Sequence, residues 1–168
     1  MGMKFTSEIV TISGSVEEAV AGTMVQETIP LVLSPLDLEV AVIYAIDLDP
    51  SFPDNIQATD TLVTGSISST SRATVGALSE SNVLATTQQG IRSNAVTSVG
   101  FQQTHPESPD AQLTYIGIVA TNNMFAQIVG VNNGNTKGLD YRIWMRRARV
   151  DAGTFAALTQ SEVLSAGL

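Results

Sequence analysis

The sequence contains no cysteine and few charged residues. Without cysteine the chain cannot form disulfides, cysteine-ligated zinc sites, iron–sulfur clusters or a thiol nucleophile, although this absence does not identify its compartment. Charged residues make up 14% of the 168 residues, whereas roughly 25% is usual for a globular domain. Lysine occurs only twice, as Lys4 and Lys137. Because surfaces covered by a partner are depleted in lysine and glutamate, this shortage favours a chain that associates with other proteins.

Basic residues and long apolar runs are scarce as well. The formal net charge is −8, so the chain should repel nucleic acid and anionic membranes, and direct nucleic-acid contact is not expected. No segment approaches the ~18 apolar residues of a membrane span, and Met1–Val10 lacks the apolar run of a signal peptide. The sequence therefore predicts a soluble chain without a signal peptide or a transmembrane segment.

Recognisable catalytic motifs are missing too. The single histidine, His105, lies in a polar, proline-bounded segment with Glu107 and Asp110 nearby. A catalytic triad or a histidine-ligated metal site would depend on this one imidazole, and a three-histidine site is impossible. Phosphate-binding glycine loops and the Gly-x-Ser-x-Gly motif are not found, and aromatic residues amount to 5%, which disfavours a sugar-binding cleft. We therefore predict that the protein is not an enzyme and uses no cofactor.

Alternating apolar residues predict β-strands along most of the chain. Strands are predicted over Glu39–Asp47, Thr61–Ser69, Ala95–Phe101, Leu113–Ala120, Met124–Val131 and Asp140–Val150. The last three are predicted to form an antiparallel meander, because Asn132–Gly138 has the asparagines and glycines of a hairpin loop. In the final strand the apolar residues change parity after Met145, which predicts a one-residue bulge near Arg146 and Arg147.

The middle of the chain is almost uncharged. Within Thr61–Thr104 only Arg72, Glu80 and Arg92 are charged, although valine, isoleucine and leucine recur throughout. Such a segment either buries one face in the core and the other against a neighbour, or forms an exposed sheet rich in serine and threonine. The sequence leaves both arrangements open.

Helices are predicted in at most two places. Ser15–Glu18 matches a capping box, whereas the alternation that follows in Val25–Ile29 favours a strand, so at most a short helix is expected between them. Asp151 is predicted to cap a second short helix that carries Phe155 and Leu158.

Around eight short strands and few helices predict an all-β fold. We expect two antiparallel sheets packed face to face as a jelly-roll-type sandwich, with at most one or two short helices. No internal repeat or linker divides the chain, so residues 1–168 are predicted to form a single β-sandwich domain. Residues 1–23 and 159–168 are predicted to be arm or tail segments.

Four aspartates, Asp47, Asp49, Asp54 and Asp60, lie within fourteen positions. Ca²⁺ is held by several carboxylate and carbonyl oxygens, so this segment is a candidate calcium loop. It lacks the spacing of an EF-hand, and the prolines among the acids are typical of a surface turn. A β-sandwich adhesion or carbohydrate-binding module, with or without calcium, therefore stays open as a function.

Four arginines, Arg142, Arg146, Arg147 and Arg149, surround Trp144 within eight positions. Guanidinium groups pair with carboxylates, and a tryptophan beside them can stack on a nucleic-acid base. A neighbouring subunit, an acidic loop of the same chain and nucleic acid are the three partners that the pattern leaves open. We predict that these five residues form a subunit interface.

Three consecutive segments share a pattern with a known family. Met124–Val131, the Asn/Gly loop and Tyr141–Val150 together resemble the end of single-jelly-roll capsid proteins of small icosahedral viruses. The resemblance implies an eight-stranded jelly roll that assembles with copies of itself, or with other shell proteins, into the closed capsid of a virion. Residues 1–23 depart from many such capsids, because they hold one lysine and three glutamates instead of a basic arm. This departure suits a shell around an internal membrane or another protein layer, or an outer decoration protein.

Overall fold

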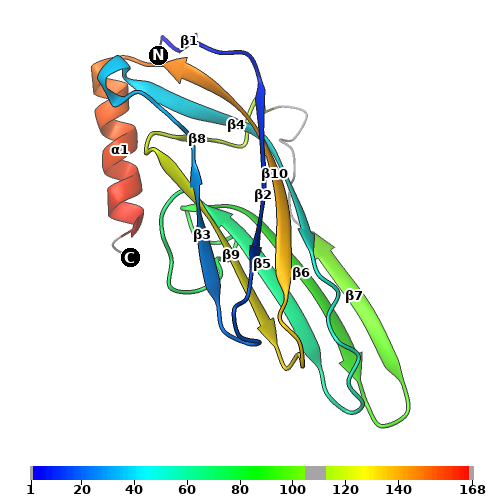
Figure 1. The fold of residues 1–168 in the computed structure, drawn as a ribbon. Coiled ribbons are helices and arrows are strands. Elements are labelled where there is room, and N and C mark those ends of the chain that lie inside the picture. The colour runs from blue at the N-terminus through cyan, green and yellow to red at the C-terminus, as the bar shows by residue number, and fades with distance from the viewer. Residues whose placement is uncertain (1, 105–112, 167–168) are drawn as a thin grey trace.

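The computed structural model of the chain describes residues 2–104 and 113–166, which form two antiparallel sheets packed face to face (Figure 1). Sheet A contains β1 (Lys4–Phe5), β2 (Val10–Glu17), β4 (Glu39–Pro50), β8 (Gly117–Val119) and β10 (Gly138–Arg149). Sheet B contains β3 (Val25–Pro30), β5 (Thr61–Ser68), β6 (Val83–Ser93), β7 (Ser98–Thr104) and β9 (Asn123–Val131). The other described elements are a 3-10 turn, η1 (Pro35–Asp37), and a helix, α1 (Ala152–Ala166). The prediction of an all-β sandwich with at most one or two short helices is confirmed.

The strand pairing is that of a jelly roll. The antiparallel pairs β2·β10, β3·β9, β4·β8 and β5·β6 form one long two-stranded ribbon. The ribbon wraps round so that β10 also pairs with β4, and β9 with β5. The resulting orders, β2-β10-β4-β8 and β3-β9-β5-β6, are the two four-stranded sheets of this fold. β1 pairs with the end of β10, and β7 extends sheet B at one edge.

The predicted three-strand meander at the C-terminal end is wrong. β8 pairs with β4, β9 pairs with β3 and β5, and β10 pairs with β2 and β4, so none of the three pairs with another. The Asn/Gly loop between Val131 and Gly138 therefore crosses from sheet B to sheet A. Asparagine and glycine permit a sharp reversal of the chain, but they do not decide whether the flanking strands exchange hydrogen bonds with each other.

The structure adds two elements that the sequence pattern does not specify. Ser15–Glu18 forms no helix, because Ser15–Glu17 ends β2 with the Val16 side chain in the core and its neighbours exposed. The sequence pattern does not predict β6, in which threonines and glutamines replace most of the expected apolar residues. Its partner β7 begins three residues after the predicted start at Ala95.

A bulge in β4 divides the apolar residues of sheet A between two cores. Trp144 and Met145 of β10 lie opposite Ala45 and Ile43, so Tyr44 of β4 is the extra residue. The bulge predicted near Arg146 is thus in the partner strand, and it does not give β10 a single apolar face. One cluster lies between the sheets and includes Ile43, Ile46, Ile143 and Met145, and a second cluster on the outer face includes Val40, Val42, Ala148 and Val150.

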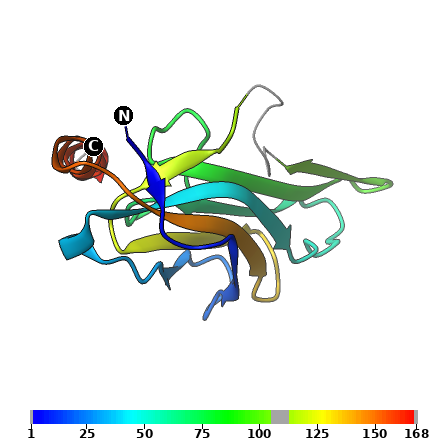
Figure 2. The same ribbon diagram turned by 90° about the horizontal axis from the view of Figure 1, so that it is seen from above.

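Helix α1 covers the second cluster with Phe155 and Leu158 (Figures 1 and 2). Asp151 caps it as predicted, since its Oδ1 accepts a hydrogen bond of 2.8 Å from the Thr154 N–H. This bond is the main cause of the lowered pKa of Asp151. The helix continues to Ala166, so most of the predicted tail is helical. Within the described residues, no helix combines the length and the apolar character needed to cross a membrane.

Glu162 fastens α1 to the sandwich. Its side chain is almost fully buried, and its two oxygens accept hydrogen bonds from the N–H groups of Ala120 (2.6 Å) and Thr121 (3.1 Å). These two N–H groups directly follow β8, where the backbone has left the sheet ladder. The carboxylate therefore supplies the acceptor that a neighbouring strand would otherwise provide.

Replacing Glu162 by alanine should lower the free energy of unfolding by about 1–2 kcal/mol, because two backbone N–H groups lose their acceptor. Urea unfolding measures this change, and amide exchange should become faster in α1 than in β10. Glu17→Ala, on the exposed face of β2, is the matched control and should change stability by less than about 0.5 kcal/mol. Equal losses in the two variants would contradict this role of Glu162.

Candidate assembly surface

Four loops meet at one end of the sandwich, which we call the Lys137 end. The loops are residues 18–24, 51–60, 94–97 and 132–137 (Figure 1). Hydrogen bonds join each loop to the next one. The Ala58 N–H, for example, donates to the Asn94 carbonyl (3.3 Å), and Asn133 Oδ1 accepts from the Asp54 N–H (2.9 Å). This end of the molecule is therefore held together by contacts between loops as well as by the sheets.

The Glu18 carboxylate is the first of two polar centres at this end. The residue is 4% exposed, and its oxygens accept hydrogen bonds from the N–H groups of Gly22 (3.2 Å), Gly130 (2.7 Å) and Lys137 (2.8 Å). Gly22 has a φ of 81°, a conformation that glycine adopts without strain, and this bends loop 18–24 back around the carboxylate. Glu18 thus ties the β2–β3 loop to the end of β9 and the start of β10.

The Lys137 ammonium group is the second centre. The residue is 5% exposed, and its Nζ lies 2.7 Å from Asp54 Oδ1 and donates a hydrogen bond of 2.9 Å to the Phe52 carbonyl. Asp54 Oδ2 accepts from the backbone N–H groups of Gly134 (2.9 Å) and Asn135 (3.0 Å). The hydrogen bond from Lys137 lowers the pKa of Asp54 from its ordinary value of 3.8, against the opposing effect of partial burial. The ion pair therefore fixes loop 51–60 against loop 132–137.

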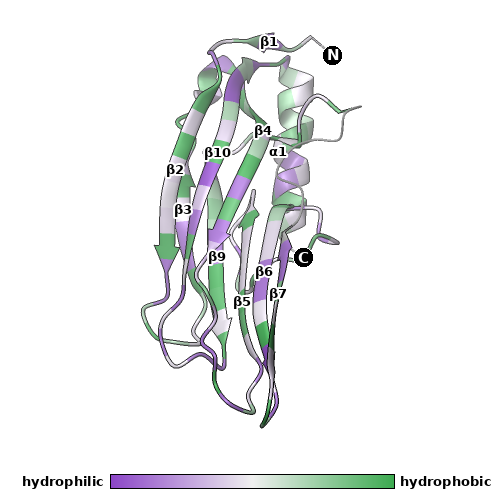
Figure 3. Cartoon of the chain, turned by 90° about the vertical axis from the view of Figure 1, so that its right-hand side faces the viewer, coloured by the Kyte–Doolittle hydropathy of each residue, from purple (hydrophilic) through white to green (hydrophobic). Residues whose placement is uncertain are grey.

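This fixed framework exposes apolar side chains. Val20 is 64% exposed, Phe52 80%, Val96 89% and Val131 43%, and the four residues come from or adjoin the four loops. Figure 3 shows hydrophobic residues (green) among the hydrophilic ones in the loops at this end. Scattered apolar residues are normal on a surface, whereas a group of them at one end is typical of a contact surface. The Lys137 end is therefore a candidate docking surface.

The sequence pattern did not identify the Lys137 end as a site. Glu18 is taken for part of a capping box, Asp54 for part of a calcium loop, and Lys137 for a hairpin residue. The available signal is the rarity of lysine: one of only two lysines lies between asparagines and glycines, where nothing requires a long cationic side chain. Its partners come from positions 119 and 83 residues earlier in the chain, which no local pattern can reveal.

Three of the predicted interface arginines organise the opposite end, which we call the arginine end. Arg147 donates to the carbonyls of Val32 (3.2 Å) and Leu31 (3.4 Å), and Arg149 lies 2.9 Å from Asp37 Oδ1. Arg146 donates to the Ser7 carbonyl (2.7 Å), and its Cζ lies 4.0 Å from the centroid of the Phe5 ring. All of these contacts are within the chain, and they hold the N-terminal segment and the β3–β4 connection against β10.

The arginine end also exposes apolar side chains. Phe5 is 38% exposed, Ile9 55%, Val32 73% and Leu36 97%. Val32 has a φ of 53°, an unusual value for a β-branched residue, in the connection that Arg147 holds. The two ends of the sandwich thus each combine cationic side chains that bind backbone carbonyls with apolar side chains that face outward.

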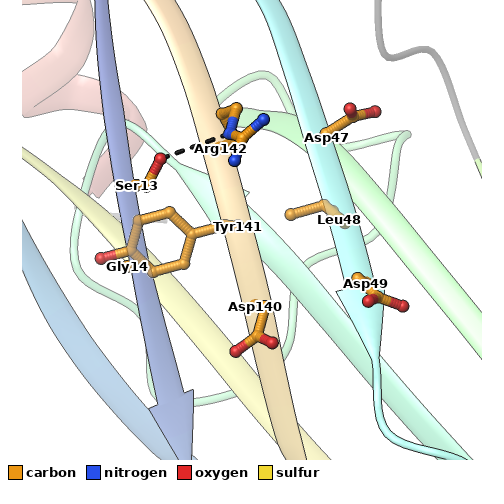
Figure 4. Close-up of a pocket in the computed structure, with 8 residues that line it drawn as sticks. All are labelled: Ser13, Gly14, Asp47, Leu48, Asp49, Asp140, Tyr141 and Arg142. Carbon is orange, nitrogen blue, oxygen red and sulfur yellow. Dashed lines mark hydrogen bonds between the residues drawn. The ribbon is translucent and has the colours of Figure 1, made fainter.

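The remaining two residues of the predicted interface lie apart from this end. Arg142 and Trp144 are on the outer face of sheet A, where the Arg142 Cζ lies 6.0 Å from the indole centroid. The Arg142 Nε lies 3.4 Å from Ser13 Oγ (Figure 4). Strand alternation separates the five residues, because 142, 144 and 146 share one face of β10 while 147 and 149 share the other. The sequence places them together along the chain, and the sheet divides them.

A shallow hollow of about 330 Å³ borders Arg142 on this face. Its lining, drawn in Figure 4, consists of Ser13, Gly14, Asp47, Leu48, Asp49, Asp140, Tyr141 and Arg142. The Tyr141 ring lies against Gly14, where a larger side chain would collide with the phenol. Burial raises the pKa of Tyr141 above 10.0, and the negative charge of Glu27 adds to this effect. The hollow thus has an acidic rim beside one guanidinium group.

The four aspartates of the candidate calcium loop do not converge. Asp47 and Asp49 lie on β4, Asp54 pairs with Lys137, and Asp60 accepts a hydrogen bond of 3.0 Å from the Ser93 N–H. In residues 2–104 and 113–166 no group of three or more histidine, aspartate or glutamate side chains is arranged to hold a metal ion. His105, Glu107 and Asp110 lie outside the described residues.

Comparison with known proteins adds no family to this description, since no protein-family model and no curated protein sequence matches the chain.

Replacing Lys137 by methionine should lower the free energy of unfolding by about 2–3 kcal/mol, because the partly buried Asp54 carboxylate and the Phe52 carbonyl lose their donor. Lys4→Met is the matched control, since it removes the other lysine from an exposed position in β1. Urea unfolding of the three proteins at pH 7 measures the difference. A loss of less than about 0.5 kcal/mol for Lys137→Met would contradict a structural role for the ion pair.

The lowered pKa of Asp54 predicts how this contribution depends on pH. The stabilisation is complete above pH 3.8 and is lost as the pH falls through the folded-state pKa, which lies below 3.8. The stability difference between the wild type and Asp54→Asn should therefore be constant from pH 7 to 5 and shrink towards pH 2. Because other carboxylates titrate equally in both proteins, urea unfolding across this range isolates Asp54. A difference that stays constant to pH 2 would show that Asp54 has no such shift.

Proposed function

We propose that this chain is a structural subunit that assembles with copies of itself into a closed protein shell, as the viral capsid proteins it resembles do in a virion. The observation that carries the proposal is the presence of two different apolar surfaces at opposite ends of one rigid sandwich. Both surfaces are made of loops and terminal segments, which are the parts of the chain that the resemblance to jelly-roll capsid proteins assigns to subunit contacts.

Two unlike surfaces have a geometric consequence. A single self-complementary patch produces a dimer and then stops, whereas contact between two different patches leaves one of each free on every new subunit. Assembly then continues until a ring or a shell closes. The Lys137 end and the arginine end are unlike in sequence and in structure, so contacts between them favour a multi-copy assembly over a simple dimer.

The jelly-roll fold is compatible with this function but is not sufficient evidence for it. Jelly rolls occur in viral capsids, lectins and cupins, and a fold by itself does not determine a function. The loop-end carboxylates help to distinguish these classes. Backbone N–H groups donate hydrogen bonds to both carboxylates, including the Lys137 N–H to Glu18, and the Lys137 ammonium group pairs with Asp54. The carboxylates that could bind a sugar or a calcium ion therefore already hold the loops in place. Exposed side chains at this end include apolar ones such as Phe52 beside neutral polar ones such as Asn132 and Asn135.

The outer face of sheet A offers a further contact of the predicted kind. Arg142 lines the same hollow as the acidic side chains of Asp47, Asp49 and Asp140. A guanidinium group next to carboxylates can pair with the same arrangement on another copy after a two-fold rotation. This part of the arginine-rich strand therefore stays within the proposed interface, whereas Arg146, Arg147 and Arg149 act within their own chain.

Replacing Phe52 by serine should weaken assembly without lowering subunit stability, because this side chain is 80% exposed and contacts mainly solvent in the single subunit. Light scattering coupled to size exclusion should show large particles for the wild type and a loss of about tenfold or more in assembly affinity for the variant. Leu78→Ser is the matched control, since Leu78 is 45% exposed in the β5–β6 loop, outside both end surfaces. A wild type that stays monomeric over a wide range of concentration and salt would refute the proposed function.

A further inference from the structure

Strand β7 forms an open edge of sheet B. It pairs with β6 over seven consecutive positions without a register shift, and within the described residues nothing pairs with its other side. The six residues Ser98–Gln103 are all exposed. α1 lies on the opposite side of the molecule (Figures 1 and 2). The described fold therefore leaves a row of backbone N–H and C=O groups available to an additional strand.

The other edge strands carry features that discourage such pairing. β3, at the opposite edge of sheet B, contains Glu27 and ends at Pro30, which has no N–H to donate. β2 ends at the charged Glu17, and β8 has only three residues. β7 has no charge, no proline and no bulge, and these are the usual means by which proteins prevent edge pairing. Among the described strands, β7 is the edge best suited to accept a partner strand.

Charge indicates what that partner is. The chain has a net charge of −8, so two copies repel each other over most of their surfaces. From Ser93 to Thr104 there is no ionisable residue, which makes this hairpin a place where copies meet with little repulsion. Phe101, packed over Gly90 of β6, supplies an aromatic side chain at the centre of the strand. A neutral edge with an aromatic centre suits pairing with an identical edge.

We infer that β7 pairs with β7 of a second copy, antiparallel about a two-fold axis at Phe101, so that two sheets B join into one continuous sheet. Phe101 then faces Phe101 of the partner subunit, and Val99 faces Gln103 of the partner subunit. This contact rests on the proposed self-assembly, to which it adds one specific two-fold interface. It adjoins the Lys137 end, since Phe52 and Phe101 line one pocket, but it is separate from the arginine end and survives when the arginine end is disrupted.

Single-cysteine variants test the register, because the natural chain contains no cysteine. Facing residues of paired strands have Cα atoms about 4.5–5.5 Å apart, within the range that a disulfide spans. Phe101→Cys should therefore form a covalent dimer on mild oxidation. Val99→Cys should not, since the two Val99 positions would lie roughly 13 Å apart along the paired strands. Cross-linking of both variants to the same extent would indicate random collision and would overturn the inferred register.

A second variant controls for the loss of the Phe101 side chain, which could disturb the β6–β7 hairpin. Phe101→Cys uncovers Gly90, whereas the double variant Val99→Cys/Gln103→Cys keeps Phe101 and places the two cysteines opposite each other across the axis. The same protein with Leu36→Ser added, at the arginine end, should still form this covalent dimer, although larger particles are lost.

The outcomes separate the two proposals. Large wild-type particles without a cross-link in either Phe101→Cys or the double variant would overturn the β7 contact and leave the shell proposal standing. A cross-linked dimer in Phe101→Cys or the double variant, together with a wild type that never exceeds a dimer, would support the β7 contact and overturn the shell. A monomer without any cross-link would overturn both.

Discussion

The surface at one end of this jelly roll depends on a single buried ammonium group. Lys137 joins loop 132–137 to loop 51–60 through Asp54 and the Phe52 carbonyl, while its own N–H is held by Glu18. Loops on a sandwich are normally its most mobile parts. Here the ion pair and the hydrogen bonds of two carboxylates replace the regular ladder that the loops lack. The exposed position of Phe52 follows from this arrangement, because its backbone is held from inside.

Cationic side chains have a similar role at the other end. In a chain with eight lysines and arginines, Arg146, Arg147 and Arg149 bind backbone carbonyls or a carboxylate of their own chain. These three guanidinium groups therefore fix segments that have no strand partner. Exposed apolar side chains such as Leu36 lie beside these segments, together with the exposed Arg149–Asp37 ion pair. In the proposed assembly, the scarcity of lysine and these apolar side chains would both follow from contact with other copies.

The sequence predicts the fold class well and the candidate site poorly. Strands such as Glu39–Asp47 and Met124–Val131 are visible because their side chains alternate between a core and a second environment. The predicted meander is wrong, since β8, β9 and β10 pair with strands that lie far earlier in the chain and not with one another. The arginine pattern identifies an important segment but not its partners, because alternation sends Arg146 and Arg147 to opposite faces. The sequence pattern does not predict the contacts among Glu18, Asp54 and Lys137, because these residues meet only in the folded chain.

The position of β10 inside sheet A determines when the molecule can fold. β10 lies between β2 and β4 and also pairs with β1, although it is the last of the described strands. During synthesis β1 and β2 therefore have no partner strand until β10, more than 120 residues later, has left the ribosome. Both strands must stay unpaired until then, and sheet A cannot be completed earlier.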